Sequence, residues 1–291
     1  MIQDILPRVM HNRYEPDKKA GPASTVLCYE NGGFALLPDG DGLRFPTFKD
    51  LFGTDGQAEG LIYLFSIDSQ EFFLAPQGTQ VPDGSVRMTV RELRSSRKTG
   101  KYLVFAGYTA MQLANWYRDN RFCGRCGQET ALADNERAIV CPNCGRRIYP
   151  RVVPAVIVGV TNGDKLLITR YARRPVAHDA LVAGFTEIGE TLEETVQREV
   201  EEEVGLKVKN IRYYKSQPWG IVDDLLMGFY CDVDGDDTIR LDDGELAVGR
   251  WVERADIEGQ PDNLSLTNEM MVVFREGKEP KKAPMTEVRS D

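Results

Sequence analysis

Eight glutamates and a single arginine lie in the 23 residues from Gly184 to Leu206. One positive and eight negative charges give this segment a net charge of −7, whereas the net charge of the whole chain is −9. Glu199, Glu202 and Glu203 stand at positions i, i+3 and i+4, and a helix would place them on one face. Crowded carboxylates repel one another, and Mg²⁺ or Mn²⁺, which take oxygen ligands and bring phosphate oxygens with them, relieve that repulsion. The pattern indicates metal-assisted phosphate chemistry, and a solvated acidic helix face is the alternative.

The residues around these glutamates predict the element that carries them. Thr191 and Glu194 have the spacing of a capping box, and Gly205 stands where a helix would end. The apolar residues that recur every fourth position are Leu192, Val196, Val200 and Val204. We therefore expect a loop followed by a helix of about three to four turns.

Four cysteines form a second group that could bind a metal. Cys123 and Cys126 make one C-x-x-C pair, Cys141 and Cys144 make another, and fourteen residues separate the pairs. A glycine follows each pair, as a tight turn that presents two sulfurs to one ion requires. Four thiolates suit tetrahedral Zn²⁺ and leave no open position for chemistry, so the site should be structural. Two disulfides are the alternative, which a reducing compartment disfavours.

Composition places limits on the function. With 42% hydrophobic and 28% charged residues, the chain has an ordinary globular composition. It contains no run of eighteen apolar residues and begins without the pattern of a secretory signal, so we expect a cytoplasmic protein with no membrane partner. A pI near 5.0 argues against a main task of gripping a nucleic-acid backbone, although a single RNA end remains compatible as a substrate.

The chain is long enough for two domains and a small insert. Apolar or alternating runs separated by turn signals, among them residues 86–93 and 102–108, predict strands, and Ala106–Arg118 has mostly helical spacing. We expect an N-terminal, mainly β, α+β domain over residues 1–120, a four-cysteine ribbon over 121–150, a catalytic domain with a mixed sheet between helices over 151–277, and a disordered tail over 278–291.

The acidic segment matches a known pattern. The nine specified positions of the Nudix box are all present: Gly184, Glu190, Arg198, Glu199, Val200, Glu202, Glu203, Gly205 and Leu206. The chain thus resembles a Nudix hydrolase, a family that cleaves nucleoside diphosphates linked to another group. The resemblance implies an α+β fold, the Nudix α/β/α sandwich.

A second motif narrows the resemblance. Ser216-Gln217-Pro218-Trp219 stands ten residues beyond the box, and together with the N-terminal domain and the ribbon it resembles the NADH pyrophosphatase subfamily of Nudix hydrolases. Members of that subfamily continue with Pro-Phe-Pro and, one residue later, Ser, whereas this chain has Gly-Ile-Val-Asp-Asp at 220–224. Another dinucleotide, such as ADP-ribose or a nucleotide sugar, is therefore the main alternative substrate.

The resemblance assigns metal-binding and catalytic roles. Glu199 and Glu203 would be the principal metal ligands, and Glu202 would be a ligand or part of the base system. The carbonyl of Ala183 and the carboxylate of Glu245 would add ligands. The box residues that would shape the loop and helix are Gly184, Glu190, Arg198 and Gly205.

The resemblance also suggests substrate contacts. Phe185 would stack on nicotinamide, and Gln217 and Trp219 would contact the dinucleotide, with a core tryptophan as the alternative for Trp219. Glu136 and Tyr149, in and after the ribbon, would reach the substrate.

The reaction implied is metal-dependent hydrolysis of NADH to reduced nicotinamide mononucleotide and AMP, with NAD-capped RNA 5′ ends as a further substrate. The resemblance also implies a homodimer in which the Ser216–Trp219 segment of one subunit completes the site of the other. A regulatory module that binds nucleic acid through the ribbon is a competing hypothesis. The arginines that support it are Arg121, Arg125, Arg137, Arg146, Arg147 and Arg151.

Overall fold

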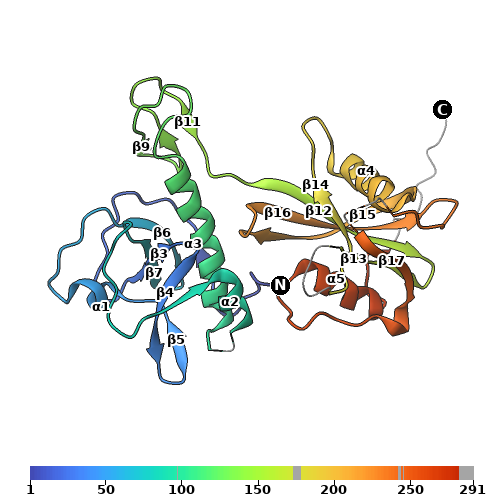
Figure 1. Ribbon diagram of the computed structural model, residues 1–291, viewed down its shortest axis with the longest axis horizontal. Coiled ribbons are helices and arrows are strands. Elements are labelled where there is room, and N and C mark those ends of the chain that lie inside the picture. The colour runs from blue at the N-terminus through green and yellow to red at the C-terminus, as the bar shows by residue number, and fades with distance from the viewer. Residues whose placement is uncertain (97, 173–177, 242–243, 245, 282–291) are drawn as a thin grey trace. The chain divides into compact units, whose positions relative to one another are not determined.

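The structure is a computed structural model that describes residues 1–96, 98–172, 178–241, 244 and 246–281. It forms two compact units (Figure 1). The first contains Met1, Val153–Pro218 and the chain from Asp224 onward, and the second contains Ile2–Val152 and Trp219–Asp223. No helix in the described ranges is long and apolar enough to cross a bilayer.

The first unit is built on a six-stranded mixed sheet. Its strands are β12 (Val153–Asn162), β13 (Lys165–Tyr171), β14 (Val182–Phe185), β15 (Val208–Trp219), β16 (Asp224–Val233) and β17 (Leu246–Glu253). The strand order is β15-β16-β12-β13-β17, with β14 also paired to β12. The long central strand β12 runs parallel to β16 and antiparallel to β13 and β14, which gives the mixed sheet that the sequence predicts.

Two helices cover opposite faces of this sheet, because alternate residues of β12 point to opposite sides (Figure 1). Val156 and Val158 belong to the core cluster of α4 (Leu192–Val204), whereas Ile157 between them belongs to that of α5 (Leu266–Arg275). The predicted α/β/α sandwich is therefore confirmed. A 3₁₀ turn, η1 (Arg254–Asp256), precedes α5.

The termini of α4 are those that the sequence predicts. The Thr191 hydroxyl accepts a hydrogen bond from the Glu194 amide, and the Glu194 carboxylate accepts one from the Thr191 amide. Gly205 ends the helix with a left-handed φ of 68°.

The predicted tail, 278–291, lies partly outside the described residues, which end at Lys281. Within them, Glu279 pairs with Arg254 at 2.8 Å.

In its described residues, the second unit contains two small sheets, a ribbon and three helices. One sheet has the order β1-β6-β7-β2, the other has β3-β4-β5 with β8 paired to β4. Their strands are β1 (Met10–His11), β2 (Thr25–Leu27), β3 (Tyr29–Glu30), β4 (Gly33–Asp39), β5 (Gly42–Arg44), β6 (Ile62–Ile67), β7 (Gln70–Leu74) and β8 (Val86–Thr89). The helices are α1 (Phe48–Phe52), α2 (Val90–Ser95) and α3 (Lys101–Asp119). The ribbon strands β9 (Ala131–Leu132), β10 (Ile139–Val140) and β11 (Arg147–Ile148) form an antiparallel sheet in the order β11-β10-β9.

Two predictions for this unit are wrong. Residues 102–108 belong to α3 rather than to a strand, because successive residues from Leu103 to Tyr108 are all buried and a continuous apolar run fits a buried helix as well as a strand. Residues 86–93 are not one strand, since a capping box formed by Thr89 and Glu92 starts α2 at Val90.

Candidate active site and metal centres

The carboxylate of Glu199 lies directly against the backbone of Gly184. A Cβ atom on Gly184 would stand 1.9 Å from Cδ of Glu199 and 2.0 Å from its Oε1. Only glycine therefore allows α4 to place this carboxylate on β14, which also contains Ala183. The box glycine is a requirement of packing between the helix and the strand, a reason that the sequence pattern does not disclose.

Arg198 connects the loop before α4 to the acidic face of the helix. Its guanidinium donates to both carboxylate oxygens of Glu190, at 2.6 and 2.9 Å, and to the backbone carbonyl of Phe185 at 2.9 Å. Its Nη1 donates to Glu199 at 2.8 Å and to Glu202 at 3.0 Å. The bond from Arg198 lowers the pKa of Glu190 to about 2, so Glu190 stays ionised and the loop stays clamped to the helix.

The three clustered glutamates have different environments. The side chain of Glu202 is 60% exposed and that of Glu199 is 12% exposed, whereas Glu203 is buried at 6%. Among the described residues, the only group of three or more Cys, His, Asp or Glu side chains whose ligand atoms all lie within 4.8 Å of one another is the four cysteines. A divalent cation is not the only positive charge that can relieve the repulsion among these carboxylates, because Arg198 donates to both Glu199 and Glu202.

The donors at this site nevertheless suit Mg²⁺ or Mn²⁺. Glu199 and the buried Glu203 are carboxylates of one helical turn, and Gly184 leaves no side chain between Glu199 and the strand. Carboxylate and carbonyl oxygens are the ligands that these hard cations prefer. Glu245, the further ligand implied by the family, lies outside the described residues.

Two expected substrate residues of the first unit have contrasting positions. Phe185, at the end of β14, is 50% exposed and could stack on a flat ring. Gln217 is fully buried, where its amide oxygen accepts from the Leu266 N–H at 2.7 Å and its amide nitrogen donates to the Leu264 carbonyl at 2.8 Å. Gln217 therefore completes the hydrogen bonding at the beginning of α5.

Trp219 belongs to the second unit and packs there. Its ring lies 5.5 Å from that of Tyr108 on α3 and 5.0 Å from the guanidinium carbon of Arg94 on α2. Gly220 follows it, and a Cβ at this position would stand 2.6 Å from the Tyr108 carbonyl oxygen. Nothing in the local sequence pointed to Tyr108 or Arg94, because they precede Trp219 by more than a hundred residues.

The two expected substrate residues of the ribbon lie together. Glu136 accepts hydrogen bonds from Arg147 at 2.6 Å and from the hydroxyl of Tyr149 at 3.2 Å. Tyr149 remains 54% exposed, so its ring is available to a ligand.

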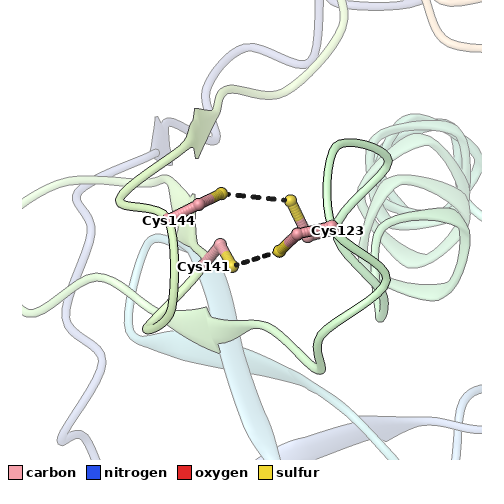
Figure 2. A group of neighbouring side chains, drawn as sticks. Cys123, Cys141 and Cys144 are labelled. Carbon is pink, nitrogen blue, oxygen red and sulfur yellow. Dashed lines mark hydrogen bonds between the residues drawn. The ribbon is translucent and has the colours of Figure 1, made fainter.

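The four cysteines converge in the geometry of a zinc centre. The sulfurs of Cys123 and Cys144 are 3.6 Å apart and those of Cys126 and Cys141 are 3.5 Å apart. Figure 2 shows Cys141 and Cys144 on one side of the cluster and Cys123 on the opposite side. Tetrahedral zinc with Zn–S bonds of about 2.3 Å would separate its sulfurs by about 3.8 Å, whereas a disulfide requires about 2.05 Å. None of these four cysteines forms a disulfide.

The two turns that carry the cysteines repeat one backbone pattern. The Gly127 N–H donates to the Cys123 carbonyl, and the Gly145 N–H donates to the Cys141 carbonyl. Both glycines have a left-handed φ, 73° and 70°, as the predicted tight turns require. Hydrogen bonds from the Arg125 and Cys126 amides lower the pKa of the Cys123 thiol to about 6, which favours the thiolate that binds metal.

Comparison with known proteins agrees with this architecture. The NUDIX domain model matches residues 150–274 and the NADH pyrophosphatase zinc ribbon domain model matches residues 118–149. The chain is similar to the "NAD-capped RNA hydrolase NudC" of Enterobacter sp. (strain 638), with 41% identity over 50% of this chain and 57% of that protein. Over the first relatives matched, the chain thus spans little more than half of their length.

Other relatives match over more of their length. The protein of the same name from Pseudomonas syringae pv. tomato is 38% identical over 85% of this chain and 88% of its own length. That from Escherichia fergusonii is 33% identical over 76% of this chain and 79% of its own length. A solved NUDIX hydrolase from Nitrosomonas europaea has a TM-score of 0.47 and 24% identity, and covers 54% of this chain and 92% of its own. The chain belongs to the Nudix hydrolase family, carrying the structural zinc ribbon of NADH pyrophosphatases beside its Nudix domain.

Proposed function

We propose that this protein hydrolyses the pyrophosphate bond of NADH and NAD⁺ to nicotinamide mononucleotide and AMP, and removes NAD from capped RNA 5′ ends. The observation that carries the proposal is the close packing of the Glu199 carboxylate against the backbone of Gly184, with Glu203 buried on the same turn of α4. The zinc ribbon and the names of the relatives, which act on NAD-capped RNA, support the choice of substrate.

In this proposal Glu199, Glu203 and the Ala183 carbonyl hold Mg²⁺ or Mn²⁺. An ion bound there would supply positive charge to the pyrophosphate and would lower the pKa of a coordinated water. Arg198 keeps the loop of Glu190 and Phe185 fixed on α4. The guanidinium of Arg198 bonds to the Phe185 carbonyl at one end of the loop and to Glu190 further along it. This bracing keeps the spacing between the ring of Phe185 and the carboxylates of α4 constant, which positions a bound dinucleotide for in-line attack.

Glu202 is the candidate proton acceptor. Its side chain is the most exposed of the three glutamates, and it is held at one oxygen by Arg198 at 3.0 Å. A carboxylate that faces water and is fixed in this way can take a proton from an attacking water.

Aromatic side chains would bind the flat parts of the substrate. Phe185 follows Gly184 directly and presents half of its surface to solvent. In the second unit, Tyr149, whose hydroxyl donates to Glu136, is the exposed ring that we assign to substrate binding. Gln217 and Trp219 make contacts within the protein, so we assign them the role of supporting the site.

The proposal is tested by ranking kcat/KM for NADH, NAD⁺, ADP-ribose, diadenosine polyphosphates and NAD-capped RNA with Mg²⁺ and with Mn²⁺. We expect NADH or capped RNA to rank first, whereas ADP-ribose in first place would favour the alternative that residues 220–224 suggest. Loss of a metal ligand costs several kcal/mol, so Glu203→Gln should reduce kcat by about 10³-fold.

A cytoplasmic location and a homodimer are further parts of this proposal. Sedimentation as a monomer at micromolar concentration would refute the dimer.

A further inference from the structure

One arginine of the ribbon points away from the ribbon. Arg137 lies in the turn between β9 and β10, and its Nη2 donates to the Leu64 carbonyl of β6 at 2.7 Å and to Oδ1 of Asn12 at 3.1 Å. Its guanidinium carbon stands 5.5 Å from the centre of the Tyr14 ring. All of these residues belong to the second unit, so Arg137 ties the ribbon to the N-terminal sheet.

A reciprocal bond fixes the same turn from the other side. The hydroxyl of Tyr14 donates to the carbonyl of Ala133 at 2.6 Å. The Ala133 amide in turn donates to the Ala138 carbonyl at 2.9 Å, which closes the turn around Arg137. The turn is therefore held to the N-terminal region by the side chain of Arg137 and by the backbone carbonyl of Ala133.

Charge balance does not explain Arg137. Among the described residues it forms no ion pair with a carboxylate, whereas Arg147 pairs with Glu136 at 2.6 Å and Arg121 with Glu129 at 3.9 Å. The guanidinium instead contacts a carbonyl, an amide and an aromatic face, whose directions are fixed by the fold. Such contacts specify geometry, because a planar guanidinium bonds only in set directions.

Glu136, the residue before Arg137, contacts the ribbon instead of the N-terminal sheet. Glu136 accepts from Arg147 and from Tyr149, the ring that the proposed function assigns to substrate binding. Consecutive residues of one turn thus reach the N-terminal sheet and the candidate substrate ring.

We propose that Arg137 is a positioning residue, which anchors the turn so that Glu136 can orient Tyr149. The inference rests on the proposed function for the role of Tyr149. Arg137 and the residues it contacts lie in the second unit, and the Nudix glutamates lie in the first. We therefore expect loss of the anchor to change substrate affinity rather than the chemical step.

The test compares Arg137→Met, which keeps much of the apolar stem, with Arg137→Lys, which keeps the charge. With zinc content unchanged, we expect Arg137→Met to raise KM for NADH about tenfold while kcat stays within about twofold, and Arg137→Lys to recover part of the loss. Arg121→Met, which removes an exposed ion pair of the same ribbon, serves as the control and should leave KM unchanged. Equal kinetics for Arg137→Met and the wild type would overturn the proposal.

Two further measurements separate positioning from general stability. In the Tyr149→Phe background, Arg137→Met should add little to KM, because both changes act through one ring, and additive effects would contradict the inference. A 3-fluorotyrosine placed at position 149 should change its ¹⁹F shift or width in Arg137→Met and not in Arg121→Met. This signal needs no turnover, so an unchanged resonance refutes the role of Arg137 as an anchor whether or not the protein hydrolyses NADH. A failure to hydrolyse NADH refutes only the proposed function.

Discussion

Replacing Gly184 by alanine tests the packing on which the candidate active site depends. The added Cβ would stand 1.9 Å from Cδ of Glu199 and 2.2 Å from its Oε2. Ordinary contact begins near 3.4 Å, so 3.4 minus 1.9 requires the carboxylate to move by about 1.5 Å. A flexible glutamate can move that far, and the fold should survive.

The displacement should nevertheless abolish most of the activity. A misplacement of about 1 Å in a reacting constellation can cost about 10²-fold in rate. We therefore expect Gly184→Ala to lower kcat for NADH about 100-fold and to weaken Mn²⁺ binding, with thermal unfolding little changed. The measurements are steady-state kinetics, Mn²⁺ titration followed by electron paramagnetic resonance, and circular dichroism.

The reasoning predicts a specific dependence on Glu199. In Glu199→Ala the obstructing carboxylate is absent, so Gly184→Ala should add almost nothing to the loss. Gly21→Ala is the matched control, because a Cβ there meets nothing within 4 Å and the residue has no left-handed φ. If Gly184→Ala kept half of the wild-type activity, or if the two losses added in the double variant, the position of the Glu199 carboxylate against Gly184 would not be the one that catalysis requires.

Three other outcomes follow from the structure. Gln217→Leu should destabilise the first unit by about 2 kcal/mol or more, because it leaves the Leu266 N–H and the Leu264 carbonyl without partners, and urea unfolding measures this. The lowered pKa of Glu190, about 2, predicts that its stabilising effect is complete above its ordinary value near 4.5 and disappears as the pH falls toward 2. The stability difference between wild type and Glu190→Gln should therefore shrink over that range, and a constant difference would contradict the clamp. Cys126→Ser should lose the single zinc ion, detected by metal analysis, and unfold the ribbon at lower temperature.

Local patterns in the sequence determined much of this protein. The capping box of Thr191 and Glu194 and the cysteine spacings depend on residues within a few positions of one another, whose geometry is set by helix and turn periodicity. The same holds for the carboxylates of one helical turn. These features are present in the structure as the sequence indicates.

Tertiary contacts decided the rest. Residues 102–108 belong to a helix in which every residue from Leu103 to Tyr108 is buried, and a continuous apolar run does not distinguish a helix from a strand. Gln217 bonds to Leu264 and Leu266, 47 and 49 residues away, and Arg137 bonds to Leu64 across 73 residues. No local pattern encodes such a partner, because only the folded chain brings together residues that are distant in sequence. The sequence by itself therefore predicted the paired cysteines and the carboxylates that share one helical turn, whereas the tertiary structure determined what holds these side chains and their neighbours in place.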